Sequence, residues 1–179
     1  VSPMRPRRDR VPDLHGFFLT DDWGTQQGPF VDKKIFEEFF LERYRWLVNE
    51  AHSHNYHIIL HSCGRVNDLL PYFIEAGVDA MNMQQPQAYG IKELGEMTCG
   101  KIAFLATADI QSTLPQGNPD EIRSEVRQII EHWSTPAGGI VVFDYGKDSA
   151  VGTDPAMAEI MFHAFRDASR ELGKPSPIR

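Results

Sequence analysis

The sequence has only two cysteines in 179 residues, Cys63 and Cys99. So few cysteines exclude a disulfide scaffold, because such domains are short and rich in paired cysteines. Long apolar runs are also absent, since no stretch approaches the roughly 18 apolar residues of a membrane span. No apolar segment follows the arginines near the start, as a signal peptide would require. A cytoplasmic protein without a membrane partner is the simplest interpretation.

Positive charge is scarce as well. The chain has 18 Lys and Arg against 25 Asp and Glu, a net charge of -7. Nucleic-acid binding needs clustered Lys and Arg, so this balance argues against it. No G-x-G-x-x-G and no Gly-Lys-Ser/Thr sequence follows any apolar run, which removes the usual nucleotide-binding interpretations.

What is present is the composition of a folded domain, with 41% hydrophobic and 24% charged residues. Apolar runs alternate with segments of helical periodicity, which predicts βαβ units and a parallel sheet with right-handed crossovers. We expect a single domain over 1–179, with an irregular segment at 1–14 and a flexible tail at 173–179. The predicted strands are 17–19, 58–60, 78–83, 102–106 and 139–143. The predicted helices are 32–54, 68–76, 88–97, 118–133 and 154–172.

The first predicted helix has Asp32 as its N-cap. Its apolar residues recur at helical spacing and are expected to pack into the core from one side of the helix. They are Ile35, Phe36, Phe39, Phe40, Leu47 and Ala51.

Polar and reactive side chains follow every predicted strand. Strand by strand they are Asp21 and Asp22; His61 and Cys63; Asn82, Gln84 and Gln85; Asp109 and Gln111; Asp144 and Tyr145. In a (β/α)8 barrel, or at the switch point of an open parallel sheet, active sites are built at this edge. Loops are polar in general, so each single position also has an ordinary explanation.

His61 and Cys63 form the most specific pair. Residues two apart on a strand point to the same side, roughly 6.5 Å apart, and their side chains can converge on one ion. Imidazole nitrogen and thiolate sulfur are preferred zinc ligands, and a catalytic site needs a third protein ligand. A buried histidine beside a small filler cysteine is the alternative. Asp21 and Asp22 point to opposite faces, so only one of them can face a shared site.

Three stretches closely resemble the C-terminal half of the uroporphyrinogen decarboxylase superfamily. They read LTDDWGTQQGPFVDKKIFEEFF, HIILHSCGRVNDLLPYFIEAGVDAMNMQQP and ADIQSTLPQGNPDEIRSEV. In motif they are most similar to its corrinoid-dependent methyltransferase-like members. The resemblance runs from about 17 to 170 and implies an α/β fold, the (β/α)8 TIM barrel. This chain would supply only about its last five βα units.

The resemblance implies a zinc-assisted methyltransferase that moves a methyl group between a corrinoid on a partner protein and a small acceptor. In those methyltransferases the H-x-C residues ligate zinc, here His61 and Cys63, together with a cysteine after the final strand. This chain reads VVFDYGKDSAVG there, without cysteine, and Asp144 is expected as the third ligand. Asp22 and Asp109 are the expected catalytic residues. Gln84, Gln85 and Tyr145 are expected to bind the small-molecule substrate.

Two alternatives remain. One is metal-independent decarboxylation of uroporphyrinogen or a related tetrapyrrole acid, although the decarboxylases carry a histidine after the last strand, where this chain has Asp144 and Tyr145. The other is a partial barrel that binds a ligand without catalysis. Five strands cannot close an eight-stranded barrel, so we expect a homo-oligomer or pairing with the missing N-terminal half.

Overall fold

The structure, a computed structural model, describes residues 11, 13–144 and 152–175. Its centre is a five-stranded sheet in the order β1-β2-β3-β4-β5, with every neighbouring pair parallel. The strands are β1 (Gly16–Thr20), β2 (His57–His61), β3 (Ala80–Met83), β4 (Ala103–Ala106) and β5 (Ile140–Val142). The predicted α/β class and parallel sheet are therefore confirmed.

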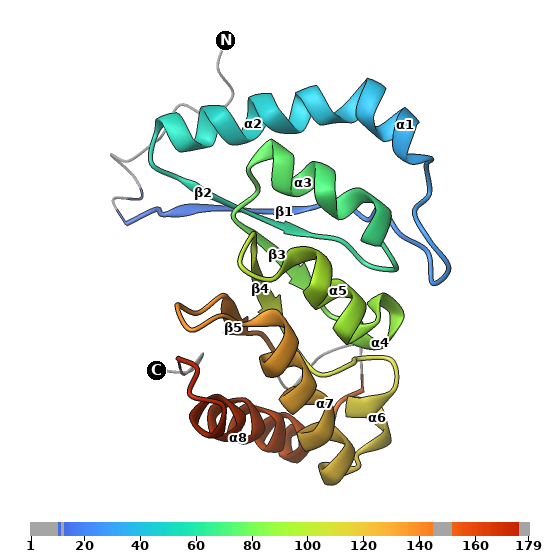
Figure 1. Cartoon of the computed structure of the whole chain (residues 1–179), viewed down its shortest axis with the longest axis vertical. Coiled ribbons are helices and arrows are strands. Elements are labelled where there is room, and N and C mark those ends of the chain that lie inside the picture. Colours follow the sequence, from blue (N-terminus) through green and yellow to red (C-terminus); the bar gives the residue numbers. More distant parts are fainter. Residues whose placement is uncertain (1–10, 12, 145–151, 176–179) are drawn as a thin grey trace.

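The helices follow the strands in chain order, from α1 and α2 at the top of Figure 1 to α8 at the bottom. After the first long helix come η2 (Asn67–Leu69, a 3-10 turn), α3 (Leu70–Ala76), α4 (Pro86–Tyr89), α5 (Ile91–Thr98), α6 (Thr113–Gln116), α7 (Pro119–Trp133) and α8 (Pro155–Glu171). Helices α7 and α8 begin where the predicted ranges 118–133 and 154–172 begin, and the Asn118 and Asp154 side chains cap them by accepting backbone N–H bonds. Among the described helices, none is both long enough and apolar enough to cross a membrane.

The first long helix contains a π-helical segment, which the sequence pattern did not predict. It runs through α1 (Lys33–Phe36), η1 (Glu37–Leu41, π-helical) and α2 (Glu42–Ser53), with the Asp32 side chain accepting from the Lys34 N–H at 2.8 Å. Across this wide turn, successive buried residues of the helix are five positions apart, Phe36 and then Leu41.

The expected apolar face is only partly confirmed. Phe36 and Ala51 are buried as expected, whereas Ile35 is 46% exposed and Phe39 50% exposed. The core positions of α2 are instead Tyr44 and Val48, together with Ala51. A π turn changes which residues share a helix face, and regular spacing cannot anticipate it.

The hydrophobic core lies between the sheet and the helices. Alternate residues of the strands point into this core and are completely buried, among them Ile58, Leu60 and Phe104. On the opposite face, Phe18 is 47% exposed and Val141 is 52% exposed. Both residues lie on the edge strands β1 and β5, so the described sheet is open, as in a partial barrel.

Candidate functional site

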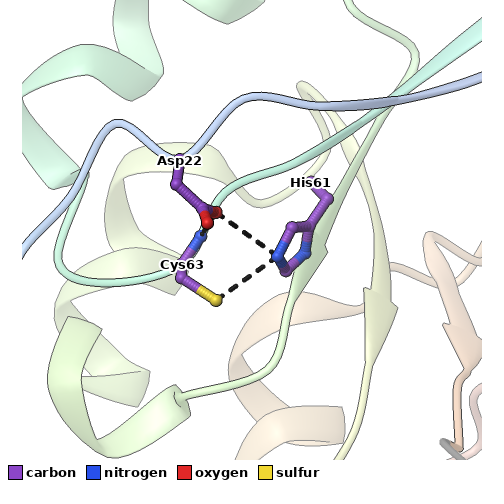
Figure 2. Close-up of side chains that lie close together, drawn as sticks. All are labelled: Asp22, His61 and Cys63. Carbon is purple, nitrogen blue, oxygen red and sulfur yellow. Dashed lines mark hydrogen bonds and ion pairs between the residues drawn. The ribbon is translucent and has the colours of Figure 1, made fainter.

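Three potential ligand atoms converge at the carboxyl end of β1 and β2. They belong to Asp22, His61 and Cys63, and all lie within 4.8 Å of one another. His61 Nε2 is 3.3 Å from Cys63 Sγ and 3.5 Å from Asp22 Oδ1. Figure 2 shows the carboxylate and the thiol on the same side of the imidazole ring. The pair predicted from H-x-C therefore converges, and a carboxylate from the loop after the neighbouring strand β1 joins it.

The convergence depends on direct docking of two loops. The Cys63 N–H donates to Asp22 Oδ1 at 2.8 Å, and the Trp23 N–H donates to Ser62 Oγ at 2.9 Å. Gly24 and Gly64 lie at the contact, where a Cβ added to Gly64 would be 2.4 Å from the Gly24 carbonyl carbon. Gly64 also has φ +73°, which favours glycine. These glycines allow the close approach that brings Asp22 to Cys63.

Asp21 and Asp22 lie in different environments and have different hydrogen-bond partners. The Tyr44 hydroxyl donates to Asp21 Oδ2 at 2.6 Å, and the Trp23 indole N–H donates to the same hydroxyl at 2.8 Å. Asp21 is therefore held by a residue of α2, while Asp22 is held by the β2 loop. Only Asp22 is part of the three-residue group.

The electrostatics of the group favour a cation. Burial raises the pKa of the Cys63 thiol, and the adjacent Asp22 carboxylate raises it further by its charge and a hydrogen bond. A bound cation reverses this effect, because a coordinating thiol is deprotonated by the metal. Nitrogen, sulfur and carboxylate oxygen are the three ligand types of zinc, and three protein ligands are the usual number at a catalytic zinc. The residues present therefore fit a zinc ion.

Gln84 and Gln85 follow β3 and are both buried. Gln85 Oε1 accepts from the Gly64 N–H at 3.0 Å, so its side chain braces the loop that carries Cys63. Gln84 Nε2 donates to Asn82 Oδ1 at 2.7 Å. The carbonyl oxygen of the Gln84 side chain is buried and has no hydrogen-bond partner among the described residues.

Asp109 lies after β4, and its carboxylate is engaged by its own loop. Oδ1 accepts from the backbone N–H groups of Gln111 and Ser112, at 2.8 and 3.0 Å. Oδ2 accepts from the Gln87 N–H at 3.2 Å. The backbone N–H of Asp109 donates to the buried Glu125 carboxylate at 2.6 Å, and burial raises the pKa of Glu125. Asp109 is thus a buried organising residue of this loop and lies outside the three-residue group.

Comparison with known proteins identifies the family of this chain. The family model for uroporphyrinogen decarboxylase (URO-D) matches residues 17–168. The chain belongs to the uroporphyrinogen decarboxylase family. This confirms the resemblance seen in the sequence motifs.

A relative and a structural neighbour of this family member come from Methanosarcina mazei. A methylated-thiol--coenzyme M methyltransferase is 26% identical over 133 residues, which are 74% of this chain and 34% of the relative. A solved methyltransferase structure has a TM-score of 0.62 and 18% identity, covering 91% of this chain and 44% of that protein. The chain thus spans less than half the length of either protein, and the structural likeness shows a shared fold.

Within this URO-D family member, the third member of the group differs from the expected ligand. Asp144 follows β5, with β3 and β4 between it and β2, and it is not in the group that contains His61 and Cys63. Asp22, expected to be catalytic, occupies that place. Tyr145 lies outside the described residues. Gly24 and Gly64 were the available sequence signal that Asp22 comes close to Cys63. They lie in two separate loops, however, and the sequence does not show that these loops touch.

Proposed function

We propose that this URO-D family member holds a zinc ion between Asp22, His61 and Cys63, and that the site transfers a methyl group between a corrinoid-carrying protein and a small acceptor. The observation that carries the proposal is the convergence of three ligand atoms within 4.8 Å. Methyl transfer is supported by the name of the Methanosarcina mazei relative, a methyltransferase of methylated thiols and coenzyme M. Coenzyme M is itself a thiol, so we propose a thiol as the acceptor here.

Three residues of the chain would bind the ion. Asp22, His61 and Cys63 would hold the ion through a carboxylate oxygen, an imidazole nitrogen and a thiolate sulfur. When bound, zinc lowers the pKa of a thiol, so the acceptor reacts as a thiolate. Cys63 gives up its proton when the ion binds, so zinc affinity should rise with pH.

The surrounding amides position the site and the substrate. Gln85 keeps the Cys63 loop in place through the Gly64 N–H. The buried, unpartnered carbonyl of Gln84 is suited to accept a hydrogen bond from a donor on the substrate. We assign Asp109 a positioning role, because its carboxylate is occupied by backbone N–H groups. Tyr145 stays a proposed substrate-binding residue.

Metal analysis tests this proposal with residues of this chain alone. Purified protein should contain stoichiometric zinc, and Cys63→Ser should contain little. Cys99→Ser is the matched control, because Cys99 is also a free cysteine but lies outside the group. Cobalt substitution should give a sulfur-to-cobalt charge-transfer band that Cys63→Ser loses and Cys99→Ser keeps.

A second pair of variants decides the oxygen ligand. Asp22→Asn should weaken zinc binding strongly, whereas Asp144→Asn should leave it near the wild-type value. The reverse order would restore Asp144 as the ligand. Equal, near-zero zinc in the wild type and in Cys63→Ser would refute the metal site. Tight porphyrin binding seen by absorbance would then favour metal-independent decarboxylation.

A further inference from the structure

Asn82 links the candidate metal site to the middle of the sheet. It lies on β3 directly opposite His61 of β2, and it is completely buried. Its side-chain Oδ1 is 2.8 Å from His61 Nδ1. Its Nδ2 donates to the backbone carbonyl of Leu105 on β4 at 3.2 Å. One amide therefore connects three neighbouring strands.

The polarity of this amide is determined by its partners. A backbone carbonyl only accepts hydrogen bonds, so the group of Asn82 that faces Leu105 must be its NH2 group. The Asn82 oxygen therefore faces His61, and the same oxygen accepts from Gln84 Nε2 at 2.7 Å. An amide oxygen cannot donate, so the neutral His61 ring must carry its proton on Nδ1.

We propose that Asn82 is a positioning residue that keeps His61 in its Nδ1–H tautomer, so that the lone pair of Nε2 faces Asp22 and Cys63. Gln84 supports it by donating to the same oxygen. This inference rests on the proposed function only for the identity of the bound ion. The His61 tautomer is a property of the metal-free protein and can be tested there. Metal-ligating histidines usually donate their second ring N–H to such an acceptor, and loss of the acceptor typically costs 10–100-fold in metal affinity.

Nuclear magnetic resonance of the metal-free protein tests the tautomer directly. Long-range 1H–15N spectra of histidine-labelled protein, recorded at a pH where the ring is neutral, distinguish protonated from unprotonated ring nitrogens. We expect His61 to show a protonated Nδ1 and an unprotonated Nε2. A proton on Nε2 in the wild type would overturn the proposal, and this spectrum needs no variant to fold.

Variants then separate positioning from a merely structural role. Asn82→Leu removes the acceptor, so the His61 spectrum should lose the single tautomer and zinc affinity should fall about 10–100-fold. Asn82→Asp keeps an acceptor for Nδ1–H and should retain the wild-type tautomer. The matched control is Asn67→Leu, because Asn67 is also a buried amide and donates to the Tyr89 carbonyl without contacting His61. It should change neither quantity.

The two failures are distinguishable. Wild-type zinc affinity in Asn82→Leu, measured by chelator competition, would overturn the positioning role while leaving the zinc site intact. Absence of zinc binding in the wild type would overturn the proposed function, while the metal-free spectrum would still decide the tautomer.

Discussion

On the helix side of the sheet, Ile58, Leu60 and Phe104 are completely buried, whereas on the opposite side Phe18 is 47% exposed and Val141 52% exposed. The same five strands thus have one face packed in a core and one face partly open. In a closed barrel the second face is the packed interior. The difference teaches that the fold of this chain is stabilised chiefly from the helix side.

The candidate site belongs to the open side. His61 shares its row across the sheet with Thr20 and Asn82, and the row continues through Leu105 to the exposed Val141. The candidate ligands do not depend on a closed interior, because hydrogen bonds between the β1 and β2 loops hold Asp22 against Cys63. For the proposed function, the substrate and the partner would therefore approach from the face that the helices leave free.

The largest expected contrast is between two phenylalanines on the two sides. Phe73 is completely buried, and its ring packs edge-on against Phe36 and Tyr44, each with centroids 5.2 Å apart. Phe73→Ala should lower the free energy of unfolding by about 3–5 kcal/mol. Phe18→Ala, on the open side, should cost about 1 kcal/mol or less, because the ring is half exposed. Urea denaturation measures both. Equal losses would show that the open face is covered in solution.

Gly64→Ala should have the next largest effect, at the loop contact. Its φ of +73° and the close Gly24 backbone both oppose a Cβ. We expect a loss of about 3 kcal/mol from the left-handed conformation and overpacking together, with weaker zinc binding as Asp22 moves from Cys63. Gly173→Ala is the control, since Gly173 has φ +64° and nothing within 4 Å of the added Cβ. It should cost only about 1–2 kcal/mol. Equal losses of unfolding free energy in the two variants would show that the loop contact does not contribute to stability.

The open face should also govern self-association. Exposed apolar residues beside an unpaired strand edge favour contact between copies, so we expect light scattering to show concentration-dependent association. Val141→Lys on β5 should weaken it several-fold. Ile35→Lys is the matched control, because Ile35 is 46% exposed but lies on the helix side. It should change little. A monodisperse wild-type monomer at high concentration would contradict this expectation.

Much of the fold could be predicted from sequence because its signals are local. Alternating apolar runs indicated the five strands, and Asp32, Asn118 and Asp154 indicated helix starts that the structure has. The π-helical segment at Glu37–Leu41 and the split of the predicted 88–97 helix at Gly90 were missed. Apolar periodicity does not encode a π turn, whereas Gly90, with φ +74°, was a local signal for the split that the periodicity did not take into account.

The site was less predictable because its geometry is not local. The H-x-C spacing indicated His61 and Cys63, two residues of one strand region. The approach of Asp22 depends on contact between two loops about 40 residues apart in the chain. Asp109 shows the opposite case, since a strand-end carboxylate predicted a catalytic residue and the structure shows its oxygens accepting backbone N–H bonds, so its catalytic role stays a prediction. The nearby Ser112 was the available signal, because short polar side chains next to an aspartate favour local hydrogen bonding.

The smallest predicted effect concerns the amino edge of the sheet, where Asp79 connects β3 to the helix side. Partial burial raises the pKa of Asp79, but hydrogen bonds from His52, the Ile58 N–H and His57 outweigh it, so the net pKa is lowered. A lowered pKa means that Asp79 stabilises the fold above its unfolded-state pKa, and that this contribution is lost as the pH falls through the folded-state value.

Asp79→Asn should therefore reduce the free energy of unfolding by at most about 1 kcal/mol at neutral pH, because the carboxylate is partly exposed to solvent. The difference from the wild type should shrink as the pH falls below about 4. Urea denaturation over a pH series measures it. The double variant His52→Ala, Asp79→Asn should lose less than the sum of the single variants, since the two side chains share a 2.8 Å contact. A difference that stays constant down to low pH would show that Asp79 acts through packing, and the helix side would then depend on apolar contacts alone.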